Sequence, residues 1–261
     1  MTLPDGAAIV FTVSGERPGY LAETLASWRR ARGVGRWRTA FLVEPGTRVP
    51  DCRAVIDGAF PDAEVVVHPE RRGVLANPHA ALTHGFAGGA AFVVLAEEDI
   101  VVADDVLEFL TWAATTCRDD PSVLAACAFS RLPAPQPSDL VTDGEFSPWV
   151  WGTWADRWHD VLDPTWFAAA RAPEPGGGNG FDFGIARTLA ATGRRVVIPR
   201  ASRSDDIGQY GGVHAVPAEY EAGRAATFVA HRPPVRFRAT DPVGVRGAPR
   251  DEAAARLPSS P

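Results

Sequence analysis

Short apolar runs and helical periodicities alternate along much of the chain. The apolar runs are typical of strands buried in a parallel sheet and fall at 7–13, 39–43, 64–67, 91–96, 123–129 and 195–198. Apolar residues at helical spacing lie between them, at 18–33, 77–86, 104–117 and 179–192. This alternation predicts an α/β fold with a mostly parallel sheet and helices on both of its faces.

Proline, asparagine and glycine mark the ends of the predicted helices. Pro18 occupies a first-turn position, and Asn77 followed by Pro78 indicates an N-cap and the first helical residue. Asn179 is the predicted cap of the last helix, and Gly193 follows its final turn, where glycine is favoured.

The pattern changes after residue 130. Residues 131–148 are rich in proline and polar side chains, which indicates a long loop, and loops of that length are usually functional or disordered. Two tryptophan-rich segments follow at 149–158 and 163–170. Beyond residue 231 periodicity is lost, so we expect one domain over 1–231 and a mobile tail rich in proline and arginine over 232–261.

Composition and charge exclude several classes of protein. The 261 residues are 46% hydrophobic and 22% charged, which suits a single full-sized core. The net charge of −6 argues against a broad positive surface for nucleic acid or for an anionic membrane. All 26 basic residues are arginine, which excludes a lysine Schiff base and a Walker-type phosphate loop.

The sequence suggests a cytoplasmic location. Acidic Asp5 precedes the first apolar run and no small-residue cleavage site follows, so the start does not resemble a signal peptide. No segment approaches the roughly 18 apolar residues of a membrane helix. The three cysteines, Cys52, Cys117 and Cys127, lack CxxC spacing, which argues against a disulfide framework and a zinc site.

Three consecutive acidic residues, Glu97, Glu98 and Asp99, follow the apolar run at 91–96. Ligands of such sheets bind beyond the carboxyl ends of the strands, so we expect the chemistry at 14–17, 44, 68–77 and 97–99. Adjacent carboxylates repel one another, and a hard divalent cation is their natural partner. The alternative is that they stay solvated and cap the helix that follows.

The segment LAEEDIVVADDVLEFL resembles the Glu-Asp-Asp motif region of the mannosyl-glycoprotein N-acetylglucosaminyltransferases, which have the GT-A fold. The resemblance implies a Rossmann-like sheet and a Mn²⁺ (or Mg²⁺) ion held by Asp99. It also implies that Glu97 and Glu98 approach the nucleoside and the donor sugar. Glu98, with a longer arm, stands where the family has aspartate.

Other segments resemble the same family in the same order. The segment FTVSGERPGYLAETLASW is similar to the first strand–helix turn, which places Ser14 and Arg17 near the nucleotide phosphate or ribose. GVLANPHAALTHGF is similar to the segment that contacts uracil, with Asn77 in place of a histidine. GNGFDFGIAR resembles a stretch whose first aspartate is the catalytic base, and Asp182 matches it.

Two further stretches extend the likeness. WVWGTWADRW resembles a stretch flanking donor and acceptor, and SRSDDIGQYGGVH resembles a mobile loop over the donor. His214, in that loop, is either a second metal ligand or a surface histidine. The likeness divides the domain into a nucleotide-binding half over about 1–130 and an acceptor half over about 131–231.

Several candidates have plain structural interpretations. Asp182 lies three residues after Asn179 and suits a first-turn acid favoured by the helix dipole. Asp205 and Asp206 are expected to be solvated loop acids. Structural roles are expected for three histidines, His68, His79 and His84. Three tryptophans beside the polar loop suit stacking on a sugar, and these are Trp149, Trp151 and Trp154.

The resemblance implies an inverting, metal-dependent glycosyltransferase. Its donor would be a UDP-sugar, with UDP-N-acetylglucosamine first, and its acceptor a hydroxyl of an unidentified small molecule or glycan. One alternative is a sugar nucleotidyltransferase, although SGERPGY lacks the usual glycine-rich loop with arginine and lysine. The other is a non-catalytic module that binds a sugar nucleotide, against which the presence of both Asp99 and Asp182 weighs.

Overall fold

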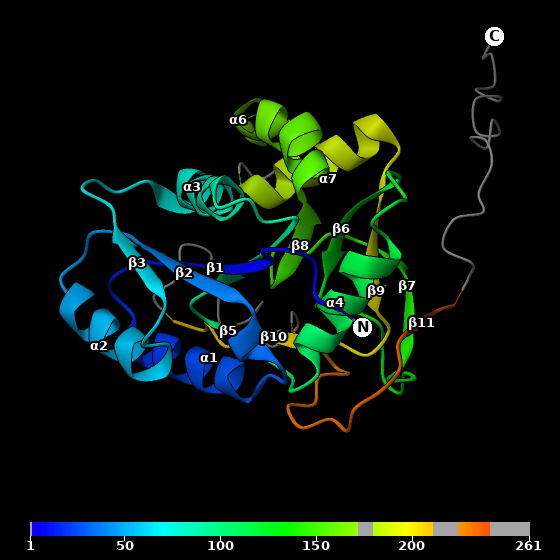
Figure 1. Ribbon diagram of the computed structural model, residues 1–261, viewed down its shortest axis with the longest axis horizontal. Helices are drawn as coiled ribbons and strands as arrows, with labels where there is room; N and C mark the ends of the chain where they lie inside the picture. Colours follow the sequence, from blue (N-terminus) through cyan, green and yellow to red (C-terminus); the bar gives the residue numbers. More distant parts are fainter. Residues whose placement is uncertain (1, 172–179, 211–223, 241–261) are drawn as a thin grey trace, which may run out of the picture.

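The computed structural model describes residues 2–171, 180–210 and 224–240. Nine strands of this part form one mixed sheet in the order β11-β7-β9-β6-β8-β4-β1-β2-β3, and two more pair separately (Figure 1). In chain order the first elements are β1 (Ala8–Val13), α1 (Pro18–Arg30), η1 (Val34–Arg36), β2 (Arg38–Val43), α2 (Val49–Ala59), β3 (Glu64–Val67), α3 (Gly73–Ala87), β4 (Phe92–Glu97), β5 (Ile100–Val102), α4 (Val106–Thr116) and β6 (Val123–Cys127).

The later elements complete both sheets. They are β7 (Leu140–Gly144), β8 (Trp151–Trp154), α5 (Ala155–Arg157), η2 (Trp158–Leu162), α6 (Asp163–Arg171), α7 (Phe181–Thr192), β9 (Arg195–Pro199), β10 (Ser204–Asp206) and β11 (Arg238–Ala239). Strands β3, β2, β1 and β4 run parallel, and β6 pairs in parallel with β9. Strand β8 lies between β4 and β6 and is antiparallel to both. The predicted α/β architecture is therefore confirmed.

Helices cover both faces of the sheet, with α1 and α2 on one side and α3, α6 and α7 on the other (Figure 1). Alternate residues of β1 point to the two sides, as a strand requires. Ile9 and Phe11 belong to the core beside α1, α2 and α4, whereas Ala8 and Val10 belong to the core beside α3, α6 and α7. The continuous apolar runs thus mark strands that are buried on both faces.

Helix α3 begins four residues before the predicted start at Asn77, so Pro78 lies inside the helix. The reason is a cap supplied from another element. Buried Glu44, just after β2, accepts hydrogen bonds from the backbone N–H groups of Arg72 and Gly73, each at 2.8 Å. These are N–H groups at the helix start that have no partner within the helix.

The chain stays folded past the predicted boundary at residue 231. Phe237 is buried and packs edge-to-face on Phe109 of α4, with ring centroids 5.7 Å apart. Strand β11 extends the sheet by pairing in parallel with β7, which itself lies inside the predicted long loop at 131–148. Residues 232–240 therefore belong to the fold and not to a tail.

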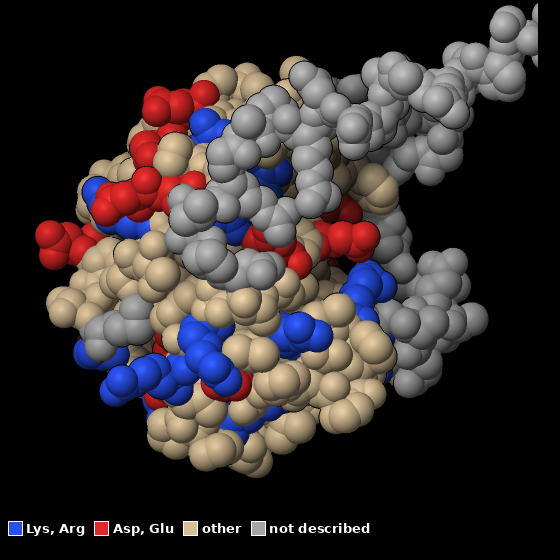
Figure 2. All heavy atoms as spheres, turned by 90° about the vertical axis from the view of Figure 1, so that its right-hand side faces the viewer, with Lys and Arg blue, Asp and Glu red and all other residues tan. Residues whose placement is uncertain are grey.

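On the face shown in Figure 2, arginine side chains lie in short groups separated by uncharged and acidic side chains, not in one continuous basic surface. Within the described residues, no helix combines the length and the apolar character needed to span a membrane.

A buried ion pair holds β10 to the start of α4. The Arg203 guanidinium and the Asp105 carboxylate have no exposed surface, and their closest atoms, Nη2 and Oδ2, are 2.9 Å apart. Arg203 also donates to the carbonyls of Ala201 and Ser138 and lies 5.0 Å from the ring centroid of Phe237. Burial lowers the pKa of Arg203, although Asp105 opposes that effect.

Replacement of Asp105 by asparagine should lower the free energy of unfolding by about 3–5 kcal/mol, because it leaves the buried Arg203 charge without its counter-ion. Urea denaturation measures the change. The matched control is Asp57→Asn, since Asp57 pairs with Arg53 at 2.7 Å but both side chains are half exposed. That change should cost less than about 1 kcal/mol. Equal effects of the two substitutions would contradict the prediction.

Candidate active site

The turn after β1 and the acidic residues after β4 meet at the carboxyl edge of the sheet. Strands β1 and β4 are neighbours, and Thr12 is in register with Glu97. The buried Glu98 carboxylate accepts the Ser14 backbone N–H at 2.8 Å and the Arg17 Nε–H at 2.7 Å. Glu98 therefore anchors the β1 turn, which explains why a carboxylate with a longer arm suits this position.

Arg17 forms ion pairs with two of the three acidic residues, Glu98 and Asp99. Its Nη2 lies 2.9 Å from Oδ2 of Asp99, and its guanidinium lies 5.5 Å from the Tyr20 ring centroid. Burial opposes its charge, but the Asp99 and Glu98 carboxylates outweigh burial and raise the pKa of Arg17. The remaining nitrogen, Nη1, is buried without a hydrogen-bond partner in the described part of the chain. A buried donor of this kind suits an oxygen of a bound ligand.

Strand β10 brings another carboxylate to the same place. It pairs antiparallel with β5, so that Asp206 is in register with Ile100, the residue after Asp99. The chain then turns back over Asp99, whose carbonyl accepts the Ile207 N–H at 2.9 Å. A side chain at Gly208 would collide with Oδ2 of Asp99 and lie 3.0 Å from Oδ1 of Asp206. Glycine at position 208 thus lets the two carboxylates approach the same space.

The prediction that Asp205 and Asp206 are solvated loop acids is wrong. Asp205 is buried and accepts hydrogen bonds from the Arg224 side chain at 2.7 Å and from the Ala225 N–H at 2.9 Å. Asp206 is half-buried, and its burial, followed by the charges of Asp99 and Asp205, raises its pKa to about 6. Asp205 therefore holds the segment at 224–225, and Asp206 faces the site.

Glu97 connects these carboxylates with Asp182. Burial raises the pKa of Glu97 well above its ordinary value, and the nearby charges of Asp99, Asp206 and Asp182 raise it further. The side chain nevertheless keeps partial exposure. Four acids from three separate segments of the chain therefore lie close enough to interact, with Arg17 as the cation that opposes them.

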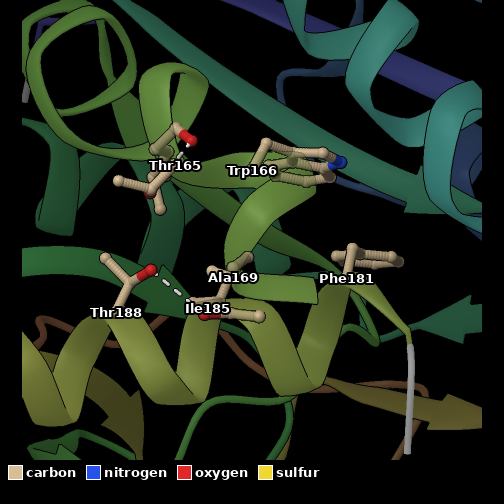
Figure 3. A pocket seen from close by; sticks show the side chains of 8 residues that line it. Thr165, Trp166, Ala169, Phe181, Ile185 and Thr188 are labelled. Atoms are coloured by element: carbon tan, nitrogen blue, oxygen red, sulfur yellow. Dashed lines mark hydrogen bonds between the residues drawn. The ribbon is translucent and has the colours of Figure 1, made fainter. Parts of the chain in front are cut away.

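Asp182 lies in the first turn of α7, just after Gly180. A side chain at position 180 would collide with its Oδ1. The adjacent Phe181 stacks on Trp166 of α6, with ring centroids 5.4 Å apart and planes 8° apart, which fixes the start of α7 (Figure 3). The small hollow beside this pair is lined mainly by apolar side chains and is a gap in helix packing.

Asn77 occupies a closed network away from these carboxylates. It is buried, and its amide donates to the Leu42 carbonyl at 3.3 Å. Its Oδ1 lies 3.0 Å from Nε2 of His68. Since Nδ1 of His68 accepts from Nε of Arg72 at 3.1 Å, Nε2 carries the proton and donates to Asn77. A contact between Asn77 and a nucleotide base stays a prediction.

The remaining candidates are histidines and tryptophans, most of which have structural roles. His79 and His84 bind carboxylates of Asp163 at 2.8 Å and Glu64 at 3.0 Å, so their predicted structural roles are confirmed. The core buries Trp151 and Trp154, which excludes both as sugar platforms, whereas Trp149 stays partly exposed. Two predicted residues, His214 and the helix cap Asn179, lie outside the described residues.

The carboxylates have the chemistry of a site for a hard cation. Oxygen ligands suit Mg²⁺ and Mn²⁺, and Asp99 and Asp206 approach the space beside Gly208. Over residues 2–171, 180–210 and 224–240, however, no three histidine, cysteine, aspartate or glutamate side chains form a ready-made metal site. An ion would compete with Arg17 for the Asp99 carboxylate, so the residues fit a cation in chemistry but are not arranged around one.

Mn²⁺ should stabilise the protein more at about pH 7.5 than at about pH 5. Asp206 and Glu97 have raised pKa values, so the folded state binds their protons more tightly than the unfolded chain does. Their contribution to stability is present at low pH and is lost as the pH rises through about 6. A cation that needs deprotonated carboxylates offsets that loss. Thermal unfolding at both pH values tests this, and an equal shift would contradict it.

This chain is similar to known proteins in its fold and not in its sequence. No protein-family model matches the sequence, and no curated protein matches it either. A mannosyltransferase from Pyrobaculum calidifontis, solved in complex with GDP-Man and Mn²⁺, superposes with a TM-score of 0.50 at 16% identity. The match covers 77% of this chain but 58% of the mannosyltransferase, so this chain spans less than two thirds of its length.

Two further solved structures are similar at lower scores. TarS 1-349 from S. aureus has a TM-score of 0.49 at 14% identity, with 76% of this chain and 59% of that chain covered. Mannose-1-phosphate geranyltransferase from Thermus thermophilus has a TM-score of 0.48 at 16% identity, with 78% and 76% covered. The mannosyltransferase likeness supports the predicted GT-A type of fold, whereas the N-acetylglucosaminyltransferase family itself finds no support.

Proposed function

We propose that this protein is a glycosyltransferase that moves a sugar from a nucleotide sugar to a hydroxyl group of an acceptor, with inversion at the anomeric carbon. The observation that carries the proposal is the approach of Asp99 and Asp206 to the same space beside Gly208, with Arg17 paired to Asp99 at 2.9 Å. A leaving diphosphate needs positive charge, and an attacking hydroxyl needs a group that accepts its proton.

The donor side is formed by the residues after β1 and β4. Arg17 keeps a buried N–H group, at Nη1, for a phosphate or ribose oxygen, while Glu98 and the Ser14 backbone hold the arginine in place. Asp99 and Asp206 would hold Mn²⁺ or Mg²⁺, which supplies charge for the departing diphosphate when it is bound. His214 remains a candidate second ligand through the resemblance alone.

The acceptor side is formed by the start of α7. The acceptor oxygen forms a bond to the anomeric carbon as the bond from that carbon to the diphosphate oxygen breaks. The hydroxyl proton passes to the Asp182 carboxylate, and the diphosphate leaves with the electron pair of the broken bond. Attack from the face opposite the leaving group accounts for inversion.

The identity of the donor rests on resemblance. The sequence favours a UDP-sugar, with UDP-N-acetylglucosamine first, whereas the solved mannosyltransferase was in complex with GDP-Man. Asn77, the candidate contact to uracil, is engaged with His68 and Leu42. A donor screen must therefore include sugar nucleotides of both uracil and guanine. Cytoplasmic location stays a prediction.

The test is release of a nucleoside diphosphate from UDP-N-acetylglucosamine, UDP-glucose or GDP-mannose in the presence of Mn²⁺, with EDTA as the control. Thermal shift with the same nucleotides reports binding without turnover, because a ligand that binds the native state raises its apparent stability. Release of pyrophosphate when a sugar phosphate and a nucleoside triphosphate are supplied would favour a nucleotidyltransferase. Binding without turnover of any donor would favour a binding module, and no binding at all would contradict the proposal.

A further inference from the structure

An aromatic pair with an arginine beside it lies past the carboxyl ends of the central strands. Phe129 follows β6 and meets Trp149 edge-to-face, with ring centroids 4.4 Å apart. The exposed Arg131 places its guanidinium carbon 5.5 Å from the Phe129 centroid and 5.6 Å from the Trp149 centroid. No carboxylate of the described residues pairs with Arg131, although the chain is acidic. Its charge therefore stays available to an anion.

The backbone beside Trp149 is strained. Val150 has φ of 67°, the only non-glycine residue with positive φ in the described part of the chain. A β-branched side chain in this region is strained, and such strain persists only where the surroundings impose it. Here the Val150 N–H donates to the Pro148 carbonyl at 2.9 Å, and the Val150 carbonyl accepts the Ala128 N–H at 2.8 Å. The strained conformation of Val150 fixes the backbone direction at Trp149.

Trp149 is also tied to the proposed active site. Its carbonyl accepts a hydrogen bond from the Ser204 hydroxyl at 2.7 Å. Ser204 precedes Asp206 by two residues on β10, a separation of roughly 7 Å along a strand. The aromatic pair therefore lies within reach of a molecule that also contacts the carboxylates. Its residues follow β6 and precede β8, and they do not belong to the β1 turn that carries Arg17.

We infer that Trp149 and Arg131 form a subsite for an anionic sugar, one that bears a carboxylate or a phosphate group. The apolar face of a sugar ring packs on the exposed part of Trp149, as aromatic rings permit. The anionic group pairs with Arg131, whose planar guanidinium suits both carboxylate and phosphate. This inference rests on the proposed function, and it assigns the subsite to the acceptor because Arg17 already serves the donor.

The experiment measures sugar binding without a donor, by ligand-observed NMR titration of the full chain. The probes are methyl β-glucuronide, glucose 6-phosphate and the neutral methyl β-glucoside. Both anionic probes should bind about tenfold or more tightly than the neutral one, as one charge-assisted hydrogen bond provides.

Three variants separate the contribution of the Arg131 charge from that of the Trp149 ring. Arg131→Gln should remove the preference for the anionic probes, whereas Arg131→Lys should keep part of it. Trp149→Leu should weaken all three probes by similar factors. Arg29→Gln is the matched control, since Arg29 is exposed on α1, and it should change nothing. Arg131 is exposed, so its variants should not affect folding.

The outcomes separate this inference from the proposed function. Equal binding of anionic and neutral probes, or an anion preference that survives in Arg131→Gln, would overturn the subsite. Weaker binding of UDP or GDP with Mn²⁺ in Arg131→Gln would also overturn it, by placing the arginine at the donor. The unmodified protein could instead bind no nucleotide and still prefer the anionic sugars. That result would contradict the proposed function and leave the subsite standing.

Discussion

Asp99→Asn is expected to weaken Mn²⁺-dependent binding of a nucleoside diphosphate by about 100-fold or more, because it removes a charged oxygen ligand from a hard cation. The side chain keeps its size, so the turn over residues 207–208 should remain. Isothermal titration with UDP or GDP, with and without Mn²⁺, measures the effect. Binding that needs no metal should change much less.

The control for this substitution is Asp119→Asn, which removes an exposed carboxylate just before β6, at the opposite edge of the sheet from Asp99. It should bind nucleotide as the unmodified protein does. Asp99 is also the partner of Arg17, so a general loss of binding at every metal concentration would show that Asp99 acts through the arginine alone. That result would reject the metal site.

Asp182→Asn should leave donor binding unchanged and reduce the rate of sugar transfer by about 10²–10⁴-fold, the usual contribution of a general base. Asparagine retains the shape and remains acceptable in the first turn of α7. The rate constant at saturating donor and the dissociation constant for the donor must be measured separately, since the hypothesis assigns the whole effect to the former.

An exposed acid on a neighbouring element provides the comparison. Asp160 lies in η2, and Asp160→Asn should alter neither quantity. If Asp182→Asn transferred sugar at nearly the normal rate, the assignment of the base would be wrong. If it lost donor binding instead, Asp182 would belong to the donor side with Glu97.

The sequence predicts which residues meet at the carboxyl edge of the sheet, because that edge depends on simple patterns. Buried parallel strands are continuous apolar runs, and the polar residues directly after them must meet at one edge. Ser14, Glu44 and Glu98 all lie at this edge, as expected. The role of Glu98 could not be predicted, since its partners are more than 80 residues away in the chain.

Pairings between distant segments account for what sequence analysis missed. Strand β10 is three residues long and acquires its place through β5, about 100 residues earlier, so nothing local distinguishes Asp206 from a loop acid. One signal was available: Asp206 lies shortly after β9, at the same edge of the sheet as Glu98. The early start of α3 has the same cause, because Glu44 caps it from a different strand.

Buried tryptophans show the limit of reasoning from residue type. Trp149, Trp151 and Trp154 lie in one segment beside a polar loop, and by residue type alone all three suit a sugar platform. The insertion of β8 between β4 and β6 buries the last two and leaves the first at the strand's end. Whether a tryptophan faces ligand or core therefore depends on which strands flank it.

The position of β8 also determines whether the two halves of the chain can exist apart. Strand β8 hydrogen-bonds to β4 on one side and to β6 on the other. A fragment that ended before it would leave both of those strands with open edges, the kind of surface that recruits other chains into aggregates. The predicted nucleotide-binding half and the predicted acceptor half are consequently not exchangeable modules, and a chimaera between related proteins would have to carry β8 together with both of its neighbours.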